Sequence, residues 1–287
     1  MNFDKLKPLA EALPENVRAN ALALVERMGE VVEGIGDREV HWRPTVLKLV
    51  QATSDRQALP KGANIGDFVL GETKLDQPVT IIPLRSWDGR QRWDPDQANN
   101  RILCSSPDAK YGFTGQECKT CPYQVWNEVE GKSECSKIKS VLVIASDLSD
   151  VFLINFAKSS YSAGTDFESL MKKANVYPYR RIYGLSSKPS TKAKNVELLS
   201  VGLLPEKERA TPDEHLPFLK ELFDQVNTDR KEMLVKFQES IAQKRLAMAT
   251  TGVGQQAIGN DAQSADSSLA NPPEEGEVSP MSRGYSI

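Results

Sequence analysis

Apolar residues recur with two different periods along this chain, and the change of period separates helical ends from a strand-rich middle. Between residue 1 and about residue 36 they recur every three or four positions, after a helix start at Pro14. A helix with one buried face has this period. The pattern predicts a helical N-terminal appendage over residues 1–40. Its core-facing positions are expected to be Val17, Ala21, Leu24, Val25 and Met28.

From His41 onward the apolar residues alternate with polar ones or form short runs bounded by Gly, Pro, Asn and Asp. Strands of a compact antiparallel sheet or barrel have this pattern. We expect strands near residues 45–52, 67–72, 78–86, 138–147, 150–158, 180–187 and 194–202.

The connections between these runs predict two hairpins. Residues 138–147 and 150–158 are joined by Leu148-Ser149, which is short enough for a tight turn. Residues 180–187 and 194–202 are expected to form the second hairpin.

A helix is expected between the two hairpins, over residues 165–174. Thr165 is followed three residues later by Glu168, and Phe167, Leu170 and Met171 are apolar. A Thr cap with a Glu at the third position and an apolar face is the start signal of an amphipathic helix.

These elements predict a mainly β fold of the α+β class, with a core over residues 41–205. One helix lies within the core, and an excursion over residues 104–135 lies between two strands. A partly open five-stranded barrel of the OB type has this form. An immunoglobulin-like sandwich is the alternative, but it would not ordinarily hold a capped helix in the middle of its sheet.

Beyond the core, helical periodicity returns over residues 206–248. The repeating apolar positions are Leu216, Phe218, Leu219, Leu222, Phe223, Val226, Met233, Leu234, Phe237 and Ile241. Residues 249–287 contain almost no large apolar side chain before Met281. Such a segment buries too little surface to compensate its ordering entropy, so we expect a disordered acidic tail.

Composition favours a soluble protein. The chain has 287 residues, 39% of them hydrophobic, and its mean hydropathy is −0.44. No apolar run approaches the roughly 18 residues that span a bilayer, and Met1 is not followed by a signal-peptide pattern. We therefore expect a cytoplasmic protein with no membrane partner.

The four cysteines of the chain fall close together, in the pattern C-x13-C-x2-C-x13-C. A C-x2-C pair places two sulfurs on one tight turn, and two further thiolates complete a tetrahedral zinc cage. The spacing predicts a structural Zn²⁺ site. Its ligands would be Cys104, Cys118, Cys121 and Cys135.

Other interpretations of the cysteines are two disulfides, four unrelated thiols, or a catalytic zinc. Disulfide frameworks belong mainly to small secreted domains. Catalytic zinc keeps an open position and usually has His or carboxylate ligands, whereas His41 and His215 lie outside the cluster. A nucleobase deaminase would need an H-x-E or C-x-E segment before P-C-x-x-C, and here the proline follows the pair.

Charge is distributed unevenly along the chain, whose net charge is −3. From Lys137 to Lys194 there are ten Lys and Arg against four Asp and Glu, a balance of +6. From Ala247 to Ile287 there are one Arg and five acids, a balance of −4. A basic middle is therefore followed by an acidic end, and a local nucleic-acid surface remains compatible with the overall charge.

Aromatic residues interleave with the cations of the basic middle. Cations neutralise phosphates and exposed rings stack on unpaired bases, so this combination indicates single-stranded nucleic-acid binding. The alternative is that single rings are core residues and the lysines form a solvated face. A second patch just before the excursion also contains Arg90 and Trp93. The candidate contacts are Arg85, Trp87, Arg92, Lys137, Lys139, Lys158, Lys172, Lys173, Tyr177, Tyr179, Arg180, Arg181, Tyr183, Lys188 and Lys192.

Several of these segments together resemble phage-type single-stranded DNA-binding proteins, such as the helix-destabilising protein of T-even phages. They are Cys104-Ser-Ser-Pro-Asp, Cys118-Lys-Thr-Cys121-Pro-Tyr, Cys135, Val141-Leu-Val-Ile-Ala-Ser-Asp-Leu and Val151-Phe-Leu-Ile-Asn-Phe. The resemblance covers residues 40–205. It implies an OB fold with a structural zinc in a loop insertion, a basic aromatic cleft and an acidic tail that contacts replication or recombination proteins.

The sequence thus predicts a non-enzymatic single-stranded DNA-binding protein of a phage or mobile element, acting in DNA replication or recombination. A zinc-stabilised adaptor that binds RNA polymerase or a replisome protein is the alternative, because the overall charge is acidic. A metal-dependent hydrolase is disfavoured, because Asp147 and Asp150 flank an expected turn and no His joins them.

Overall fold

The computed structural model describes residues 3–29, 32–33, 39–40, 44–51, 54, 59–94, 102–125, 128, 133–174, 176–189, 197–204 and 209–250. The chain divides into two compact units, Met1–Lys244 and Arg245–Ile287. In the second unit the described residues, 245–250, are helical. The predicted tail otherwise lies outside the described residues.

The described residues 3–29 of the N-terminal appendage are mainly helical, as predicted, but residues 32–33 and 39–40 of the predicted helical range form strands. A 3-10 turn, η1 (Phe3–Lys5), leads into α1 (Leu6–Glu11), and α2 (Glu15–Gly29) follows. Pro14 separates the two α-helices, and its carbonyl accepts the backbone N–H groups of Val17 and Arg18. After α2, the short strands β1 (Val32–Glu33) and β2 (Glu39–Val40) pair antiparallel.

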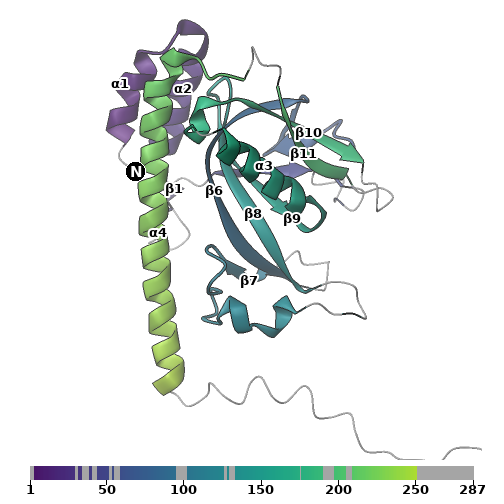
Figure 1. Ribbon diagram of the computed structural model, residues 1–287. Coiled ribbons are helices and arrows are strands. Elements are labelled where there is room, and N and C mark those ends of the chain that lie inside the picture. The colour runs from purple at the N-terminus through teal and green to yellow at the C-terminus, as the bar shows by residue number, and fades with distance from the viewer. Residues whose placement is uncertain are drawn as a thin grey trace, which may run out of the picture. The chain divides into compact units, whose positions relative to one another are not determined.

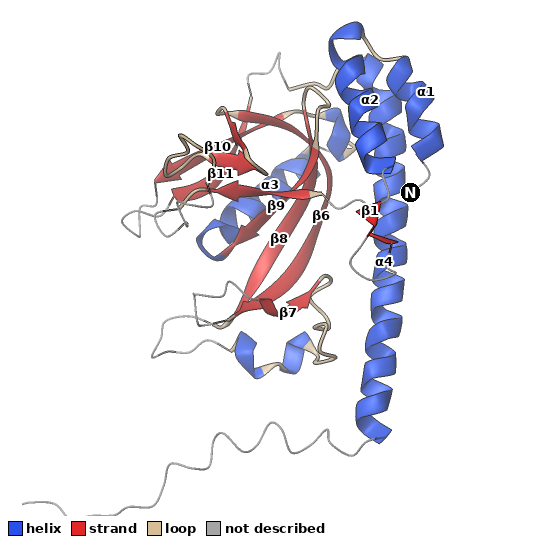
Figure 2. Ribbon diagram, turned by 180° about the vertical axis from the view of Figure 1, so that it is seen from behind, coloured by secondary structure: helices blue, strands red, loops and turns tan. Residues whose placement is uncertain are grey.

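A larger sheet forms the middle of the chain (Figures 1 and 2). It follows the order β11-β10-β6-β8-β9-β3-β4-β5, and β7 pairs with β6. Strands β3 and β9 are parallel, and the other described pairs are antiparallel. The sheet curls into a half-barrel, so the fold is mixed α+β, as predicted at this level. The strands are β3 (Thr45–Leu49), β4 (Phe68–Leu70), β5 (Thr73–Leu75), β6 (Val79–Trp93), β7 (Ile102–Ser106), β8 (Cys135–Ala145), β9 (Val151–Ala157), β10 (Tyr183–Pro189) and β11 (Glu197–Leu203).

Both predicted hairpins are present, as the pairs β8–β9 and β10–β11. The sequence did not predict β5 or β7, because three or five residues without clear alternation give little signal. It also ended β6 near residue 86, whereas the strand continues to Trp93. Within that extension Arg90, Gln91 and Arg92 are paired on both sides, with β7 and with β8.

A register shift between Pro83 and Arg85 changes which face of the sheet the residues of β6 occupy. Before the shift, Ile82 lies on one face and Ile81 on the other. Leu84 is the extra residue of the bulge, so Arg85 returns to the face of Ile82. A bulge has this effect because side chains alternate with a period of two.

One face of the sheet encloses a core closed by α3 (Tyr161–Lys173), which lies across β8 and β9 in Figure 1. Phe167 of α3 contacts Phe156 of β9 and Tyr183 of β10 edge to face. The predicted cap at Thr165 is wrong. The helix begins four residues earlier, after the 3-10 turn η5 (Lys158–Ser160), and the Thr165 hydroxyl donates to the Tyr161 carbonyl inside the helix.

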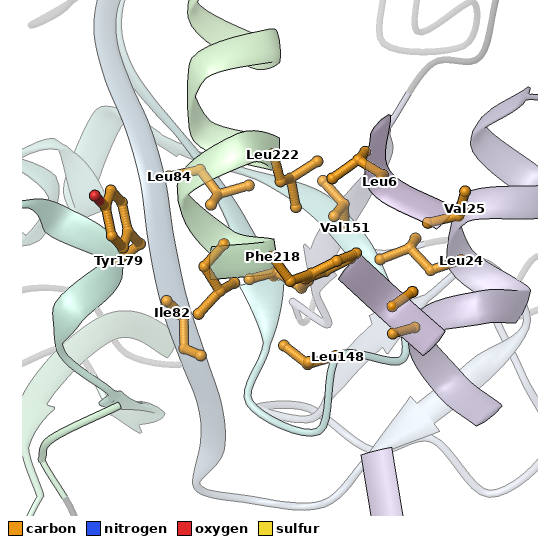
Figure 3. Packing of buried hydrophobic residues seen from close by; sticks show 14 of the residues in the cluster. Leu6, Leu24, Val25, Ile82, Leu84, Leu148, Val151, Tyr179, Phe218 and Leu222 are labelled. Atoms are coloured by element: carbon orange, nitrogen blue, oxygen red, sulfur yellow. The ribbon is translucent and has the colours of Figure 1, made fainter. Parts of the chain in front are cut away.

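The opposite face of the sheet packs against α1, α2 and α4 (Leu216–Thr250), which follows the turn η8 (Asp213–His215). Figure 3 shows Phe218 and Leu222 of α4 between Ile82 and Leu84 of β6 and Leu24 of α2. Phe218 is 1% exposed. The predicted C-terminal helix is therefore present, and its first half is fixed to the sheet by apolar burial.

Gly164 permits the close approach of α3 to the sheet, and we predict that its replacement destabilises the protein. A Cβ atom at this position would lie 2.6 Å from Cβ of Phe156. Gly164→Ala should reduce the free energy of unfolding by about 1–3 kcal/mol through overpacking, measured by urea denaturation. Ser162→Ala, at an exposed position of the same helix, is the control and should raise stability slightly. A stabilised Gly164→Ala variant would contradict the close packing.

Candidate metal centre and nucleic-acid interface

The four cysteines come from three elements that meet at the distal end of β6. Cys104 of β7 and Cys135 of β8 both pair with Arg92 of β6, one on each side. Cross-strand partners point to the same face of a sheet. Cys118 begins the 3-10 turn η3 (Cys118–Thr120), and Cys121 follows it, before η4 (Pro122–Gln124). The fold therefore brings a tight turn with two thiols to a strand pair with two more.

The loop between β7 and η3 is held by backbone and side-chain hydrogen bonds. Asp108 Oδ1 accepts from Ser106 Oγ at 3.2 Å and from the backbone N–H of Lys110 at 2.9 Å. The Cys118 N–H donates to the Lys110 carbonyl at 2.8 Å. Gly112 passes so close to Cys104 that a Cβ atom there would lie 2.4 Å from the sulfur. A side chain at Gly112 would thus occupy the space beside the Cys104 thiol.

The charges of neighbouring cysteines act on the two buried thiols, Cys118 and Cys135. Burial raises the pKa of Cys118, and the charges of Cys104 and Cys121 raise it further. Burial also raises the pKa of Cys135, with further contributions from Cys121 and Cys118. The Arg90 guanidinium opposes both shifts, and it donates a hydrogen bond to Cys135.

All four cysteines are free thiols. Among the described residues, no three His, Cys, Asp or Glu side chains converge as a ready metal-binding group. The backbone positions determine whether four sulfurs can come within reach of one metal ion. The χ1 rotamers then determine whether the sulfurs point toward it. Here Cys118 lies within electrostatic reach of the other three cysteines.

Arg92, a predicted nucleic-acid contact, is engaged inside the excursion. Its Nη2 atom lies 2.7 Å from Glu134 Oε2, and its guanidinium lies 3.2 Å from the centroid of the Tyr123 ring. Its side chain is 20% exposed. Arg92 thus ties the excursion together beside the cysteines.

Lys139, another predicted contact, is buried. Its Nζ atom lies 2.7 Å from Asp88 Oδ1 and 2.5 Å from Glu168 Oε2, and its side chain is 4% exposed. Burial lowers the pKa of Lys139, but hydrogen bonds with both carboxylates raise it more, so the net shift is upward. This placement contradicts the predicted phosphate contact. Lys139 instead links α3 to β6 and β8.

The three predicted stacking tyrosines have different surroundings. Tyr179, in η6 (Pro178–Arg180), is 4% exposed, and Tyr183 is 1% exposed. Burial raises the pKa of both phenols. These placements contradict base stacking by either ring. Tyr177, in contrast, is 59% exposed. Its ring lies parallel to that of Tyr179, with centroids 5.4 Å apart and 13° between the planes, and Phe223 meets it edge to face at 6.1 Å.

Most of the remaining predicted cations reach solvent. Lys172 also pairs with Glu168 at 3.0 Å while its side chain stays 74% exposed. Arg181 is half-buried, and Lys192 lies outside the described residues. The exposed members of the predicted set are Lys137, Lys158, Lys172, Lys173, Arg180 and Lys188.

Arg85 and Trp87 face α4 and are half-buried. Arg85 Nη1 donates to the Asn227 carbonyl at 3.3 Å and to the Asn227 side-chain oxygen. The Arg230 guanidinium lies 4.2 Å from the centroid of the Trp87 ring. The second predicted patch is therefore partly covered by a helix.

Sequence reasoning missed the α4 residues Phe223, Asn227 and Arg230 as neighbours of the candidate residues. Their spacing of four and three places them on one helix face, and this shared face could have been predicted from the sequence. Nothing in the sequence, however, says which strand that face meets. Arg90 was named in the second predicted patch, but its position beside the cysteines was not predicted, although it shares a strand face with Arg92.

The comparisons with known proteins give no match: no protein-family model, no curated protein and no solved structure matches this chain. Within the described ranges, no helix combines the length and apolar character needed to cross a bilayer. Function is therefore inferred from the residues and their geometry.

We predict that Lys139 supports the fold. Lys139→Met leaves Glu168 partly buried beside one exposed partner, Lys172, and should lower the free energy of unfolding by about 2–4 kcal/mol in urea denaturation. The loss should shrink as the pH falls. Burial raises the pKa of Glu168, but hydrogen bonds from Lys139 and Lys172 lower it more, so protonation at low pH removes this stabilising contribution from the parent.

Lys172→Met is the matched control and should change stability by less than about 0.5 kcal/mol, because surface ion pairs contribute little. Adding Glu168→Leu to Lys139→Met should recover most of the loss. Unchanged stability of Lys139→Met together with weaker oligonucleotide binding would restore the original prediction for Lys139.

Proposed function

We propose that this protein binds single-stranded nucleic acid through an OB-type barrel braced by a zinc-bound excursion. The observation that carries the proposal is Tyr177, an aromatic ring that is 59% exposed yet held parallel to a buried ring. A ring fixed in this way loses little conformational entropy when a base stacks on it.

The curled sheet supports an OB-type barrel. Strands β6, β8, β9, β3 and β4 are consecutive neighbours, and α3 covers the core that they enclose. An OB fold is a partly open, five-stranded barrel whose face and loops bind oligonucleotides. The long loop excursions of such a barrel belong to its binding surface.

Cations near the Tyr177 ring suit the phosphates of a bound strand. Arg180 is exposed and lies three residues from Tyr177, and its charge acts on Tyr179 together with that of Lys220. Lys173 ends α3, four residues before Tyr177. Ring and cations together provide stacking and charge neutralisation, the two requirements for binding unpaired strands without sequence preference.

The cysteine cluster fits a structural zinc ion. Its donor set is four thiols, which zinc binds tetrahedrally without an open position. Four thiolates exceed the charge of one Zn²⁺, and the Arg90 guanidinium beside Cys135 and Cys118 reduces the excess. Cys104, Cys118, Cys121 and Cys135 would hold the metal, whose role is to fix the excursion against the barrel.

More particularly, we propose a single-stranded DNA-binding protein of a phage or mobile element that serves replication or recombination in the host cytoplasm. The resemblance over residues 40–205 supports this assignment. Binding is an equilibrium capture and requires no catalytic group. The acidic end of the chain would contact replication or recombination proteins.

An adaptor that binds RNA polymerase or a replisome protein is a second candidate. It is favoured by apolar side chains exposed on and beside the excursion. Val125 of the excursion is 66% exposed, and Trp93 at the end of β6 and Ile102 at the start of β7 are 39% and 38% exposed. Protein capture that survives nuclease treatment, combined with no oligonucleotide binding, would favour the adaptor over the DNA-binding protein.

We predict that the Tyr177 ring contributes directly to binding. A labelled oligonucleotide of roughly 30 bases, longer than the site of a single OB fold, should bind the full chain at low salt and dissociate as salt rises. Tyr177→Ala should weaken binding by about 1–3 kcal/mol, the range for one stacked base. Tyr177→Phe preserves the ring and should bind almost as the parent does.

These measurements use fluorescence anisotropy over a range of salt concentrations. The DNA-binding proposal is wrong if the parent does not bind at low salt. The role of Tyr177 is wrong if the parent binds and Tyr177→Ala binds equally well.

We also predict one bound zinc ion per chain, measured by elemental analysis of the purified protein. Cys121→Ser should lose the metal, whereas Lys119→Ala, an exposed change in the same knuckle, should retain it. Chelation should expose the excursion to proteolysis and weaken oligonucleotide binding in parallel. Metal-free protein with an intact excursion and undiminished binding would refute the structural zinc.

A further inference from the structure

Two arginines from distant parts of the chain meet beside an indole ring on the face of β6 that is turned toward α4. Arg85 comes from β6 and Arg230 from α4, and Trp87 lies two residues after Arg85 on the same strand face. Figure 1 shows the two elements running alongside each other. Arg85 is anchored on Asn227, and the Arg230 guanidinium rests on the Trp87 ring.

The hydrogen-bond acceptors that these guanidiniums use are neutral. Arg85 donates to the backbone and side-chain oxygens of Asn227, and Arg230 Nη2 donates to the Pro107 carbonyl. Within the part of the chain that the structure describes, neither arginine forms an ion pair with a carboxylate. Arg230 Nε is buried and has no hydrogen-bond partner among the described residues.

Asp108 is the acid whose charge acts on Arg230, but its hydrogen-bonding capacity is used in the excursion. One carboxylate oxygen accepts from Ser106, Lys110 and Tyr111, and the other accepts from Gln238 of α4 at 3.4 Å. Asp108 therefore braces the loop and does not bridge the two guanidiniums.

Both burial and charge repulsion act on the pKa of Arg230. Burial lowers its pKa, and the charge of Arg85 lowers it further, to about 10 against the opposing effect of Asp108. Burial also lowers the pKa of Arg85. Asp108 offsets only part of this effect, because the net shift at Arg230 is downward. A bound anion would relieve the remaining repulsion between the two guanidiniums.

We propose that Arg85 and Arg230 together bind a phosphodiester group of the single-stranded nucleic acid, so that α4 forms one wall of the binding groove. Planar guanidinium forks match the oxygens of a phosphate and bind them bidentately. The inference rests on the proposed nucleic-acid-binding function and adds Arg230, a residue outside the basic middle of the sequence.

The arginine pair and the Tyr177 ring lie along the same face of α4. Phe223, which contacts Tyr177, and Arg230 are seven residues apart. At 1.5 Å per residue this separation is about 10 Å along the helix axis. One strand can therefore place a base on Tyr177 and a neighbouring phosphate between Arg85 and Arg230.

The test compares two neutralising substitutions on neighbouring positions of α4 in the full chain. Arg230→Gln removes the proposed phosphate contact, and Lys231→Gln removes one charge from an exposed position. Binding of a fluorescent oligonucleotide of about 30 thymidines is measured over a series of salt concentrations. Arg230→Gln should weaken binding about tenfold at low salt and reduce the slope of log K against log salt by about 0.7. Lys231→Gln should bind as the parent does.

Circular dichroism would establish that each variant is folded at the temperature of the titration. If Arg230→Gln does not fold, Arg230→Lys replaces it. This variant keeps the charge but loses the fork, so it should bind several-fold more weakly with an unchanged salt slope. Parent-like affinity and slope in a folded Arg230→Gln, or parent-like affinity in Arg230→Lys, would overturn the phosphate site. A parent that does not bind the oligonucleotide would instead overturn the proposed function.

Discussion

The continuity of β6 is the constraint on which the rest of the described structure depends. This one strand pairs with β10 near its start, with β8 along most of its length, and with β7 at its end. The half-barrel and the cysteine excursion therefore share a backbone, and neither can rotate freely against the other. Because cross-strand hydrogen bonds fix the register, the position of Cys104 and Cys135 beside Arg92 follows from the same ladder that positions the core residue Ile82.

The bulge in β6 determines which of its side chains lie on the α3 face of the sheet and which lie on the α4 face. If Leu84 were paired in regular register, with no bulge, strict alternation would place Arg85 on the face of Ile81, toward α3. With the bulge, Arg85 and Trp87 face α4, while Asp88, Arg90 and Arg92 share the face of Lys139 and the cysteines. One strand thus presents its cations to two different environments, the cysteine cluster on one face and α4 on the other.

The sequence predicted the helices and strands that have long or periodic apolar patterns. It did not predict which side chains are buried where tertiary packing decides the burial. Buried runs such as 141–145 and the helical stripe from Leu216 had enough length to be recognised. Tyr177, Tyr179 and Tyr183 could not be distinguished, because the turn η6 between them breaks the alternation and sends one ring outward and two inward. For the same reason a lysine in a basic run, Lys139, proved to be an internal ion-pair partner. A count of charges along the sequence does not show which lysine is buried. Lys139 is buried because α3 packs over β8.

Helix α4 links the cysteine cluster to the proposed nucleic-acid groove, because the helix is fixed in two different ways along its length. Its first half is anchored by apolar burial of Phe218, Leu219 and Leu222. From Arg230 onward the helix contacts the excursion through polar groups, from Arg230 to Pro107, from Gln238 to Asp108 and from Lys244 to the Phe113 carbonyl at 2.8 Å. Apolar burial is insensitive to the order of the excursion, but these hydrogen bonds exist only while the loop from residue 107 to residue 113 keeps its conformation. A metal that orders this loop would therefore also hold α4 from Arg230 onward against β6. In the proposed arrangement a zinc ion would act on the proposed nucleic-acid groove without contacting the bound strand.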